Sequence, residues 1–492
     1  MFNIVIAVLD SVRAANCSLF GYGRRTNPGL EELAPEFVVY KNAFSTTIST
    51  VPAHASLFTG THVSTHGLFV EGHRLTPGLI TLAEFLAGLG YATFGICYQD
   101  DVSPVTGLHR GFGEFHMDDE PSSFKKLVRE ILWSHKGPVP KDGQDRPGNC
   151  APRHGLMSRV RETKFFKELY WMATRNSDQG AASSRKKIDR FLYNSGWSSG
   201  CSAAPCPGRA ARPFFMYVHY DEAHLPYRPP SPFRSSFLAG AGNGKRPAVV
   251  NQDRTRFYLD PRIMDEGDFN VLRSLYDGSI LYLDSMVSGL YRSLKGMGLM
   301  ENTMFIVLSD HGDHLGEHGL MSHKYALCDH LTRVPLMIKY PGSFGIRGNH
   351  EGIVQITDIF PTIADALGVP RERIPVQLEG NSLISGRMMN RAGQYAVSEL
   401  MKPFGKEIDH FKRQLRHYHR IMYAVRGARY KCVRDAKGRT EIFDLMNDPE
   451  ELNGMQLILS GADGEIKRVM EQADSHLPRF RECNRKFAGL TG

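Results

Sequence analysis

Three apolar segments of the sequence end in residues that can bind a divalent cation. The segment "FNIVIAVLD" ends at Asp10, and "TMFIVLSDHGD" carries Asp310 and His311 after its apolar run. The third segment, "PFFMYVHYDEAH", ends in the same kind of polar cluster. Two carboxylates and an imidazole at one place form a divalent-cation site with mixed oxygen and nitrogen ligands. A single aspartate of this kind would mean little, but three similar ends indicate a shared site.

The stretch "STVPAHASLFTG", residues 49–60, places a threonine at the start of an expected helix. Thr50 fits the N-cap, a proline follows in the first turn, and a helical run continues from there. The N-terminus of a helix offers unpaired N–H groups and the positive end of the helix dipole to an anion. By itself Thr50 would be no more than a cap. Beside a cation that lowers the pKa of its hydroxyl, the same side chain becomes a nucleophile.

The elements that carry these residues indicate an α/β fold. The continuous apolar runs are typical of strands buried on both faces, whereas "ITLAEFLAGLG" has the pattern of an amphipathic helix and "YATFGICY" that of the next strand. This alternation predicts a large, mostly parallel central sheet with helices on both faces. Such sheets bind ligands at the carboxyl ends of their strands, where all three polar clusters fall.

The chain divides into a large domain and a small one. With 492 residues, 41% of them hydrophobic, it can bury a large core. We expect a catalytic α/β domain over residues 1–385, with a loop-rich insertion at about 118–212 where Gly, Pro and Ser accumulate. After that domain, "YAVRGARYKCVRD" and a final helical segment predict a small C-terminal α+β subdomain over residues 386–492.

Composition limits the partners and the location. The first residues, "MFNIVIAVLDSVR", predict a buried strand rather than a signal peptide, and no apolar run has the length of a membrane span. Eight scattered cysteines without an export signal favour reduced thiols and a cytoplasmic protein. The net charge of +8 suits a small anionic substrate, although solvated helix faces explain it more simply. No basic patch is interleaved with aromatic residues, so no nucleic acid is indicated.

Together these motifs resemble the alkaline phosphatase superfamily and, within it, the branch of sulfatases, phosphonate monoester hydrolases and phosphoglycerol transferases. The resemblance covers nearly the whole chain: "NIVIAVLDSVRAANCSLFGYGRRTNPGLEELA", "TVPAHASLFTGTHVSTHG", "YVHYDEAHLPYRPP", "LSDHGDHLGEHGLMSHKYALCDHLTRVPLMIKYPG", "QITDIFPTIADALGV", and "YAVRGARYKCVRD" followed by "FDLMNDPEELN". It implies a large α/β domain with a metal site at the sheet edge and a small C-terminal domain with a short sheet and a helix.

The resemblance also shows where this chain departs from sulfatases. Their nucleophile stretch looks like C-x-P-S-R-A-x-L-L-T-G, with the cysteine oxidised to formylglycine. Thr50 stands at that position here, and Ala53 and His54 replace the Ser-Arg pair. The replaced arginine helps to hold formylglycine and substrate in sulfatases, so the role of His54 stays open. Cys150 begins "CAPRHG", which is one residue short of C-x-P-x-R, and chance explains it better than a formylglycine site.

The resemblance implies a metal site of Asp10, Thr50, Asp310 and His311, the pattern of the superfamily's threonine enzymes. Ser11 stands where sulfatases usually have a second aspartate. We expect one divalent ion, Mn, Ca or Mg. Two zinc ions are the alternative, but they require a D-x-x-x-H motif, and the acid and histidine of "DEAH" are one residue too close.

The resemblance further implies basic residues that contact the substrate. His224, in "DEAHLPY", matches the family's substrate-contacting histidine. The next basic position is ambiguous: His323 fits when residues are counted from Asp310, and Lys324 fits when they are counted back from "RVP". Both stay candidates for the catalytic base position.

The missing cysteine bears on the reaction. A formylglycine hydrate can release sulfate by elimination, whereas a threonine ester must be opened by attack at the central atom, as phosphoryl-transfer enzymes do routinely. We therefore expect a metal-dependent hydrolase or transferase of phosphate esters, phosphodiesters or phosphonate esters with a covalent Thr50 intermediate. The alternatives are a sulfatase without formylglycine and a catalytically silent member that binds an anion. The natural substrate, the acceptor and the oligomeric state stay open, a homo-oligomer included.

Overall fold

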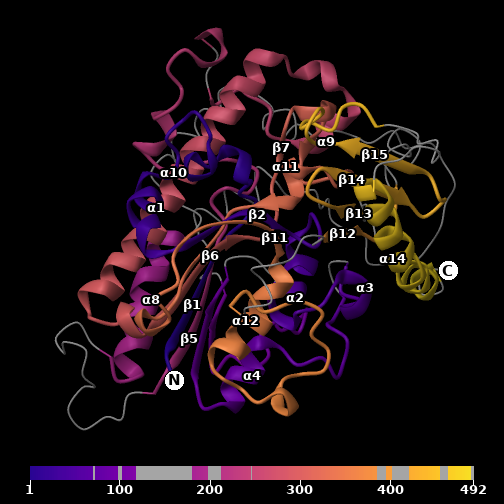
Figure 1. Ribbon diagram of the computed structural model, residues 1–492. Coiled ribbons are helices and arrows are strands. Elements are labelled where there is room, and N and C mark those ends of the chain that lie inside the picture. The colour runs from indigo at the N-terminus through magenta and orange to yellow at the C-terminus, as the bar shows by residue number, and fades with distance from the viewer. Residues whose placement is uncertain are drawn as a thin grey trace, which may run out of the picture.

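The computed structural model describes residues 1–69, 73–97, 102–117, 180–197, 212–244, 247–384, 395–401, 420–454 and 464–488. Figure 1 shows a central sheet between two groups of helices, with a smaller sheet and its helix beside it. This arrangement confirms the predicted fold, an α/β domain with a small C-terminal α+β region. The predicted boundary between residues 385 and 386 lies outside the described residues.

Within the described residues the central sheet has nine strands: eight lie in the order β11-β2-β10-β6-β1-β5-β3-β4, and β9 pairs with β2 beside this path. The bounds are β1 Asn3–Leu9, β2 Val38–Phe44, β3 Ala92–Ile96, β4 Glu114–His116, β5 Phe214–Tyr220, β6 Thr303–Ser309, β9 Arg333–Val334, β10 Leu336–Lys339 and β11 Gly348–Gln355. β10 is antiparallel to both neighbours and β9 is antiparallel to β2, whereas the other pairs are parallel. The prediction of a mostly parallel sheet is confirmed, with β10 reversed inside it.

The register of the parallel strands brings three carboxyl ends to one edge. Leu9 of β1 pairs with Tyr220 of β5 on one side and with Ser309 of β6 on the other. The residues that follow these three strands therefore start level with one another. All three strands are buried along their whole length, as continuous apolar runs predict for strands covered on both faces.

Two layers of helices cover the sheet (Figure 1). Val5 and Ala7 of β1 share a core with α1, α8 and α10, whereas Ile4 and Ile6 share a core with α2, α4 and α12. The helices in the described part of the large domain are α1 Pro28–Leu33, α2 Thr50–Thr59, α3 Val63–His66, α4 Leu82–Gly88, α8 Ala181–Asn194, α9 Arg254–Leu259, α10 Glu266–Gly296, α11 Asp329–Thr332 and α12 Ile359–Ala366. Packing on both faces holds the central strands, and with them the residues at their carboxyl ends.

The described residues of the C-terminal region form a four-stranded antiparallel sheet and one long helix. The strands β12 Ala396–Leu400, β13 Met422–Arg426, β14 Tyr430–Asp435 and β15 Thr440–Asp444 lie in that order, and α14 spans Gly464–Ala488. Tyr423 and Val425 of β13 share a core with Val469 and Phe480 of α14. The helix therefore covers one face of the small sheet.

The predicted insertion at about 118–212 lies mostly outside the described residues. The part that is described, 180–197, contains α8, a helix rather than a loop. Ile188 and Phe191 of α8 are buried in the core, whereas Arg185 and Arg190 are exposed. The basic segment "SSRKKIDR" is thus a solvated helix face, the simpler of the interpretations considered for it.

Two further observations concern the described residues as a group. None of their helices is both long and apolar enough to cross a membrane. Their five cysteines, at positions 17, 97, 328, 432 and 483, form no disulfide with one another. The cytoplasmic location stays a prediction.

Candidate active site

The carboxyl ends of β1 and β6 bring two aspartates and a histidine together. Donor atoms of Asp10, Asp310 and His311 lie within 4.8 Å of one another, and all three side chains are buried. The Ser11 hydroxyl donates to Asp10 Oδ1 at 2.6 Å, and the Ser11 N–H donates to Asp310 Oδ1 at 3.1 Å. This serine has a φ of 62°, a left-handed conformation that is strained for a non-glycine residue. Ser11 therefore orients both carboxylates at the position where sulfatases usually have a second aspartate.

Thr50 faces this cluster from the start of α2. Its Oγ1 lies 3.2 Å from His311 Nε2. His311 Nδ1 lies 3.1 Å from the Gly312 carbonyl, which can only accept, so Nδ1 carries the ring proton and Nε2 presents a lone pair to the threonine. The prediction of Thr50 as N-cap is wrong by one residue: Ser49 is the N-cap and Thr50 is the first helical residue. The contact with His311 places the Thr50 hydroxyl beside the carboxylate cluster.

The donor set of this cluster fits a divalent cation. Asp310 Oδ2 is buried and has no hydrogen-bond partner among the described residues, an arrangement that is costly unless another group binds the oxygen. Burial and the negative charge of the neighbouring Asp10 raise the pKa of Asp310 to about 6. A cation between the two carboxylates would relieve their repulsion. The 3.2 Å between Thr50 Oγ1 and His311 Nε2 is close to the ~3 Å between adjacent ligands of an ion with ~2.1 Å bonds.

His219 of β5 belongs to the site, although its place inside an apolar run conceals it in the sequence. Its Nε2 lies 3.1 Å from Asp10 Oδ2, and its Nδ1 lies 3.3 Å from Cys97 Sγ. Burial opposes the charge of Asp10, but the His219 ring at 3.1 Å and the nearby His224 and His311 hold the pKa of Asp10 well below its ordinary value. Burial lowers the pKa of His219, but Cys97 and Asp10 outweigh this effect and raise the pKa well above its ordinary value. Asp10 is thus kept ionised.

His54 supports the first turn of α2. Its Nδ1 lies 2.8 Å from the Thr50 carbonyl oxygen and 3.9 Å from Asp310 Oδ2. Its ring is fully buried, with its centroid 4.8 Å from that of His219. Burial first, and then His219, lower the pKa of His54 to about 3. The ring is therefore neutral at pH 7 and does not replace the positive charge of the arginine that sulfatases have here.

Two further histidines lie beside His311. The ring centroid of His323 is 4.4 Å from that of His311 and 5.1 Å from that of His224. His323 Nδ1 lies 3.0 Å from Asp313 Oδ1, and Tyr227 donates its hydroxyl to Asp313 Oδ2 at 2.5 Å. Burial raises the pKa of Asp313 to about 7, although the Tyr227 hydrogen bond opposes the shift. Asp313 and Tyr227 thus fix the His323 ring through Nδ1 and leave its Nε2 for other partners.

Lys324 is buried close to the same two histidines. Burial, and then charges that include Lys324, lower the pKa of His224 to about 4 and that of His323 well below its ordinary value. Both rings are therefore neutral at pH 7. The structure brings His323 and Lys324 to one place, so the two ways of counting along the sequence point to adjacent parts of one site.

Sequence reasoning missed two residues of this site, His219 and Asp313. A signal for each was present: His219 is the one histidine in the apolar run "FFMYVHY", and Asp313 is the second acid of "DHGD". The pattern does not show that the first faces Asp10 and the second faces His323. Those contacts depend on strand pairing and on the loop after β6.

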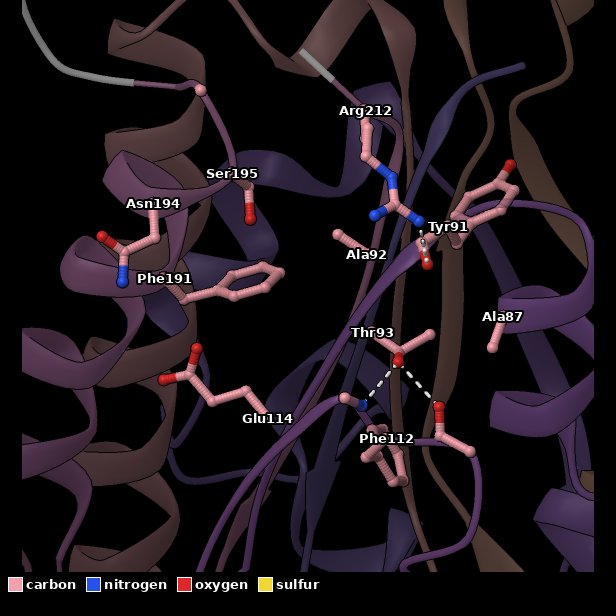
Figure 2. Close-up of a pocket in the computed structure, with 13 residues that line it drawn as sticks. Ala87, Tyr91, Ala92, Thr93, Phe112, Glu114, Phe191, Asn194, Ser195 and Arg212 are labelled. Atoms are coloured by element: carbon pink, nitrogen blue, oxygen red, sulfur yellow. Dashed lines mark hydrogen bonds between the residues drawn. The ribbon is translucent and has the colours of Figure 1, made fainter. Parts of the chain in front are cut away.

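A separate cavity of about 720 Å³ lies at the amino-terminal end of β3 (Figure 2). Its lining includes Thr93 of β3, Phe191 of α8, and Arg212, which donates to the Gly90 carbonyl at 3.0 Å. None of the candidate site residues lines it. Because β3 is parallel to β5, this cavity lies at the end of the sheet opposite the carboxylate cluster. It therefore does not belong to the candidate active site.

Comparisons with known proteins agree with these motifs. Residues 2–132 and 207–369 match the sulfatase family, and residues 316–481 match the family described as N-sulphoglucosamine sulphohydrolase, C-terminal. Choline-sulfatase of Rhizobium meliloti is 30% identical over 92% of this chain and 82% of its own. The multifunctional alkaline phosphatase superfamily protein PehA of Trinickia caryophylli is 23% identical over 97% of both chains.

A solved structure extends the comparison to the fold. The phosphonate monoester hydrolase of Agrobacterium radiobacter is similar with a TM-score of 0.65 at 20% identity, over 98% of this chain and 96% of that one. The sequence matches and this fold similarity cover both the central sheet and the C-terminal region. The chain therefore belongs to the sulfatase family, within the alkaline phosphatase superfamily, as the resemblance of its motifs implied.

Proposed function

We propose that this chain is a metal-dependent hydrolase or transferase of phosphate esters, phosphodiesters or phosphonate esters that forms a covalent intermediate on Thr50. The observation that carries the proposal is the position of Thr50 Oγ1, 3.2 Å from His311 Nε2 at a cluster of two buried carboxylates. Family membership supports hydrolysis of sulfate or phosphate esters in general. The threonine favours phosphorus, because its ester can be opened only by attack at the central atom.

Asp10, Asp310, His311 and Thr50 would hold the divalent cation. A divalent ion held there would lower the pKa of the Thr50 hydroxyl and neutralise negative charge on the ester oxygens. Ser11 holds both carboxylates in position through its hydroxyl and its N–H. We favour one ion, Mn, Ca or Mg, and keep a pair of zinc ions as the alternative.

In the first step Thr50 Oγ1 attacks phosphorus. A bond forms between this oxygen and phosphorus as the bond from phosphorus to the leaving oxygen breaks, and the hydroxyl proton of Thr50 ends on the leaving oxygen. Lys324 is buried near both His224 and His323. Its ammonium charge suits the transferred anion and the departing oxygen. The product of this step is a phosphoryl or phosphonyl ester of Thr50.

In the second step water or another alcohol attacks the same phosphorus atom. The bond from phosphorus to Thr50 Oγ1 breaks, the acceptor's proton moves to a neutral imidazole, and a proton returns from that imidazole to Oγ1. His323 is suited to take it, because Asp313 holds its Nδ1 and its Nε2 is left for the acceptor. This pair favours His323 as the catalytic base and leaves Lys324 to stabilise negative charge.

Replacing His323 by alanine is expected to reduce turnover by about 10²-fold or more, the usual contribution of a general base. Lys324→Ala should also reduce turnover, because it removes charge near the transferred group. Metal content should stay near that of the wild type in both variants, since neither residue is placed among the ligands. Turnover and metal content are measured on the same purified samples. Equal loss of metal and activity in His323→Ala would make it a ligand and would favour the two-zinc alternative.

Asp313→Asn tests whether His323 is positioned through Nδ1. The amide can offer the imidazole either its oxygen or its N–H group, so the ring is no longer held in one tautomer. We expect kcat to fall by about 10-fold to 100-fold, the usual cost of an outer-shell partner, with little change in KM. The double variant Asp313→Asn, His323→Ala should be no slower than His323→Ala alone. An additive loss in the double variant would mean that Asp313 acts independently of His323.

A substrate panel tests the proposed reaction class. Aryl phosphate, phosphodiester, phosphonate monoester and sulfate ester substrates are compared with the enzyme loaded in turn with Mn, Mg, Ca or Zn. We expect phosphorus esters to be turned over with higher kcat/KM than the matched sulfate ester. Turnover of sulfate esters alone would favour the sulfatase alternative, which the 30% identity to choline-sulfatase supports. No turnover with any metal would favour the silent anion-binding alternative.

A further inference from the structure

A second group of metal-competent side chains lies on the segment that runs from β7, His314–Leu315, to β9. The group consists of His314, His318, Cys328 and His330, called here the His-Cys cluster. Donor atoms of His318, Cys328 and His330 lie within 4.8 Å of one another, and Cys328 Sγ lies 3.5 Å from His314 Nε2. The cluster shares no residue with the proposed catalytic metal site.

Local structure turns the three imidazole rings towards one another. His314 is the first residue of β7, which spans His314–Leu315, and His330 lies in α11. His318 has a φ of 56°, a conformation that is strained for a non-glycine residue, so the surrounding loop must hold it there. The ring centroids of His314 and His318 are 5.6 Å apart, and those of His318 and His330 are 6.1 Å apart. The three rings therefore lie near one another, with His314, His318 and His330 each near the Cys328 thiol.

These residue types match a zinc-type cation better than a magnesium-type one. Cysteine and histidine together are ligands for zinc and similar late first-row ions, whereas magnesium and calcium prefer oxygen. With Zn–S bonds of ~2.3 Å and Zn–N bonds of ~2.05 Å, the sulfur and nitrogen ligands of a tetrahedral zinc lie about 3.6 Å apart. The observed 3.5 Å between Cys328 Sγ and His314 Nε2 is close to that separation.

Two carboxylates lie next to the histidines of the cluster. His314 Nδ1 is 4.0 Å from Glu317 Oε2, and His330 Nε2 is 3.4 Å from Glu450 Oε2. His314 is fully buried, and its Nδ1 has no hydrogen-bond partner among the described residues. Histidines that bind metal commonly pair their second ring nitrogen with a carboxylate, and negative charge nearby offsets that of the cation.

We propose that the His-Cys cluster binds one zinc-type divalent cation through Cys328, His318 and His330, whose donor atoms lie within 4.8 Å of one another, with His314 beside the thiol. On binding, the S–H bond of Cys328 breaks, its proton leaves to solvent, and the thiolate bonds to the cation. His318 is exposed, which gives the cation a path from solvent. Three protein ligands leave the fourth tetrahedral position for a further group.

The position of Cys328 indicates what such a site would stabilise. Cys328 shares a buried cluster with Met422 of β13 and Val433 of β14, and Glu450 follows β15. A cation here would tie the loop after β6 to the C-terminal sheet. Without a cation, burial raises the pKa of the Cys328 thiol, and the contact with His314 would be a weak hydrogen bond. Whether the protein binds a zinc-type cation therefore decides between a metal site and a weak thiol hydrogen bond.

Cobalt provides a direct probe, because a Co²⁺–thiolate bond gives a charge-transfer absorption band that oxygen and nitrogen ligands do not. The full-length protein is stripped with a chelator and titrated with Co²⁺, and then with Zn²⁺ as competitor. We expect a saturable band in the wild type, lost in Cys328→Ser and displaced by Zn²⁺. Asp310→Asn, which disrupts the catalytic site, should keep the band, so this test is independent of the proposed reaction.

Cys97→Ser is the matched control, because Cys97 is also buried and also lies 3.3 Å from a histidine nitrogen. This variant should keep the band. His318→Asn removes a ligand but keeps a residue type that tolerates positive φ. This variant should lower the affinity for Zn²⁺ by more than about 10-fold. It keeps the test decisive if Cys328→Ser does not fold. A wild type without the band, or unchanged zinc affinity in His318→Asn, would overturn the proposal.

Discussion

Thr50→Ala is expected to lower turnover of phosphorus esters by at least about 10³-fold, because it removes the oxygen that attacks phosphorus. Thr50→Ser keeps a hydroxyl at the same position and should retain part of the activity. The free energy of unfolding should fall by only about 1 kcal/mol, since the side chain loses one hydrogen bond, to His311, and caps no helix. Turnover, metal content and denaturant unfolding are measured for both variants.

Thr59→Ala is the matched control for this prediction. Thr59 is the last residue of the same helix, is fully buried, and donates its hydroxyl to the Ala55 carbonyl at 2.6 Å. Its loss should cost a similar amount of stability and leave turnover near that of the wild type. Near-normal activity in Thr50→Ala would show that water attacks the ester directly and that no covalent step is needed.

Asp310→Asn is expected to remove both the catalytic metal and most of the activity. Asp310 Oδ2 is buried without a hydrogen-bond partner among the described residues, and an amide there is a poorer ligand than a carboxylate. Turnover should fall by at least about 10²-fold, more than an outer-shell partner usually costs. Chelation of the wild type should give a similar loss, and Mn or Mg should restore it. Metal analysis and turnover before and after chelation check both results.

Asp284→Asn separates loss of metal from loss of stability. Asp284 is also buried, but it accepts the N–H groups of Gly29 at 2.7 Å and Leu30 at 2.8 Å, far along the chain from the proposed ligands. This variant should be less stable and should keep its metal. If Asp310→Asn retained both metal and turnover, the assignment of the cluster as the catalytic metal site would be wrong.

The fold and most of the carboxylate cluster could be predicted from the sequence because both depend on local pattern. A continuous apolar run that ends in a polar residue predicts a buried strand and a residue at its carboxyl end, as for Asp10 and Asp310. Parallel pairing then brings these ends to one edge. The orientation of β10 could not be predicted, because its apolar run is the same in either direction. Its antiparallel pairing with β6 is a tertiary feature.

Other details depended on choices that the sequence leaves nearly equal. Ser49 and Thr50 are both good N-cap residues, so the pattern could not decide which one caps α2. His219 was concealed because a strand that is apolar throughout gives no signal about which face a single polar residue takes. Its contact with Asp10 follows from the register of β1 and β5. The resemblance likewise left His323 and Lys324 open, and the structure brings both to the site.

Covalent modification of Thr50 is the central claim, and mass spectrometry of a trapped intermediate tests it most directly. The metal-loaded enzyme is mixed with a slowly released aryl phosphate, quenched in acid and digested. We predict the mass of a phosphoryl group on the peptide that contains Thr50, present in Thr50→Ser at the serine and absent from Thr50→Ala. An unmodified Thr50 peptide during steady turnover, or a phosphoryl group on another residue, would contradict the account.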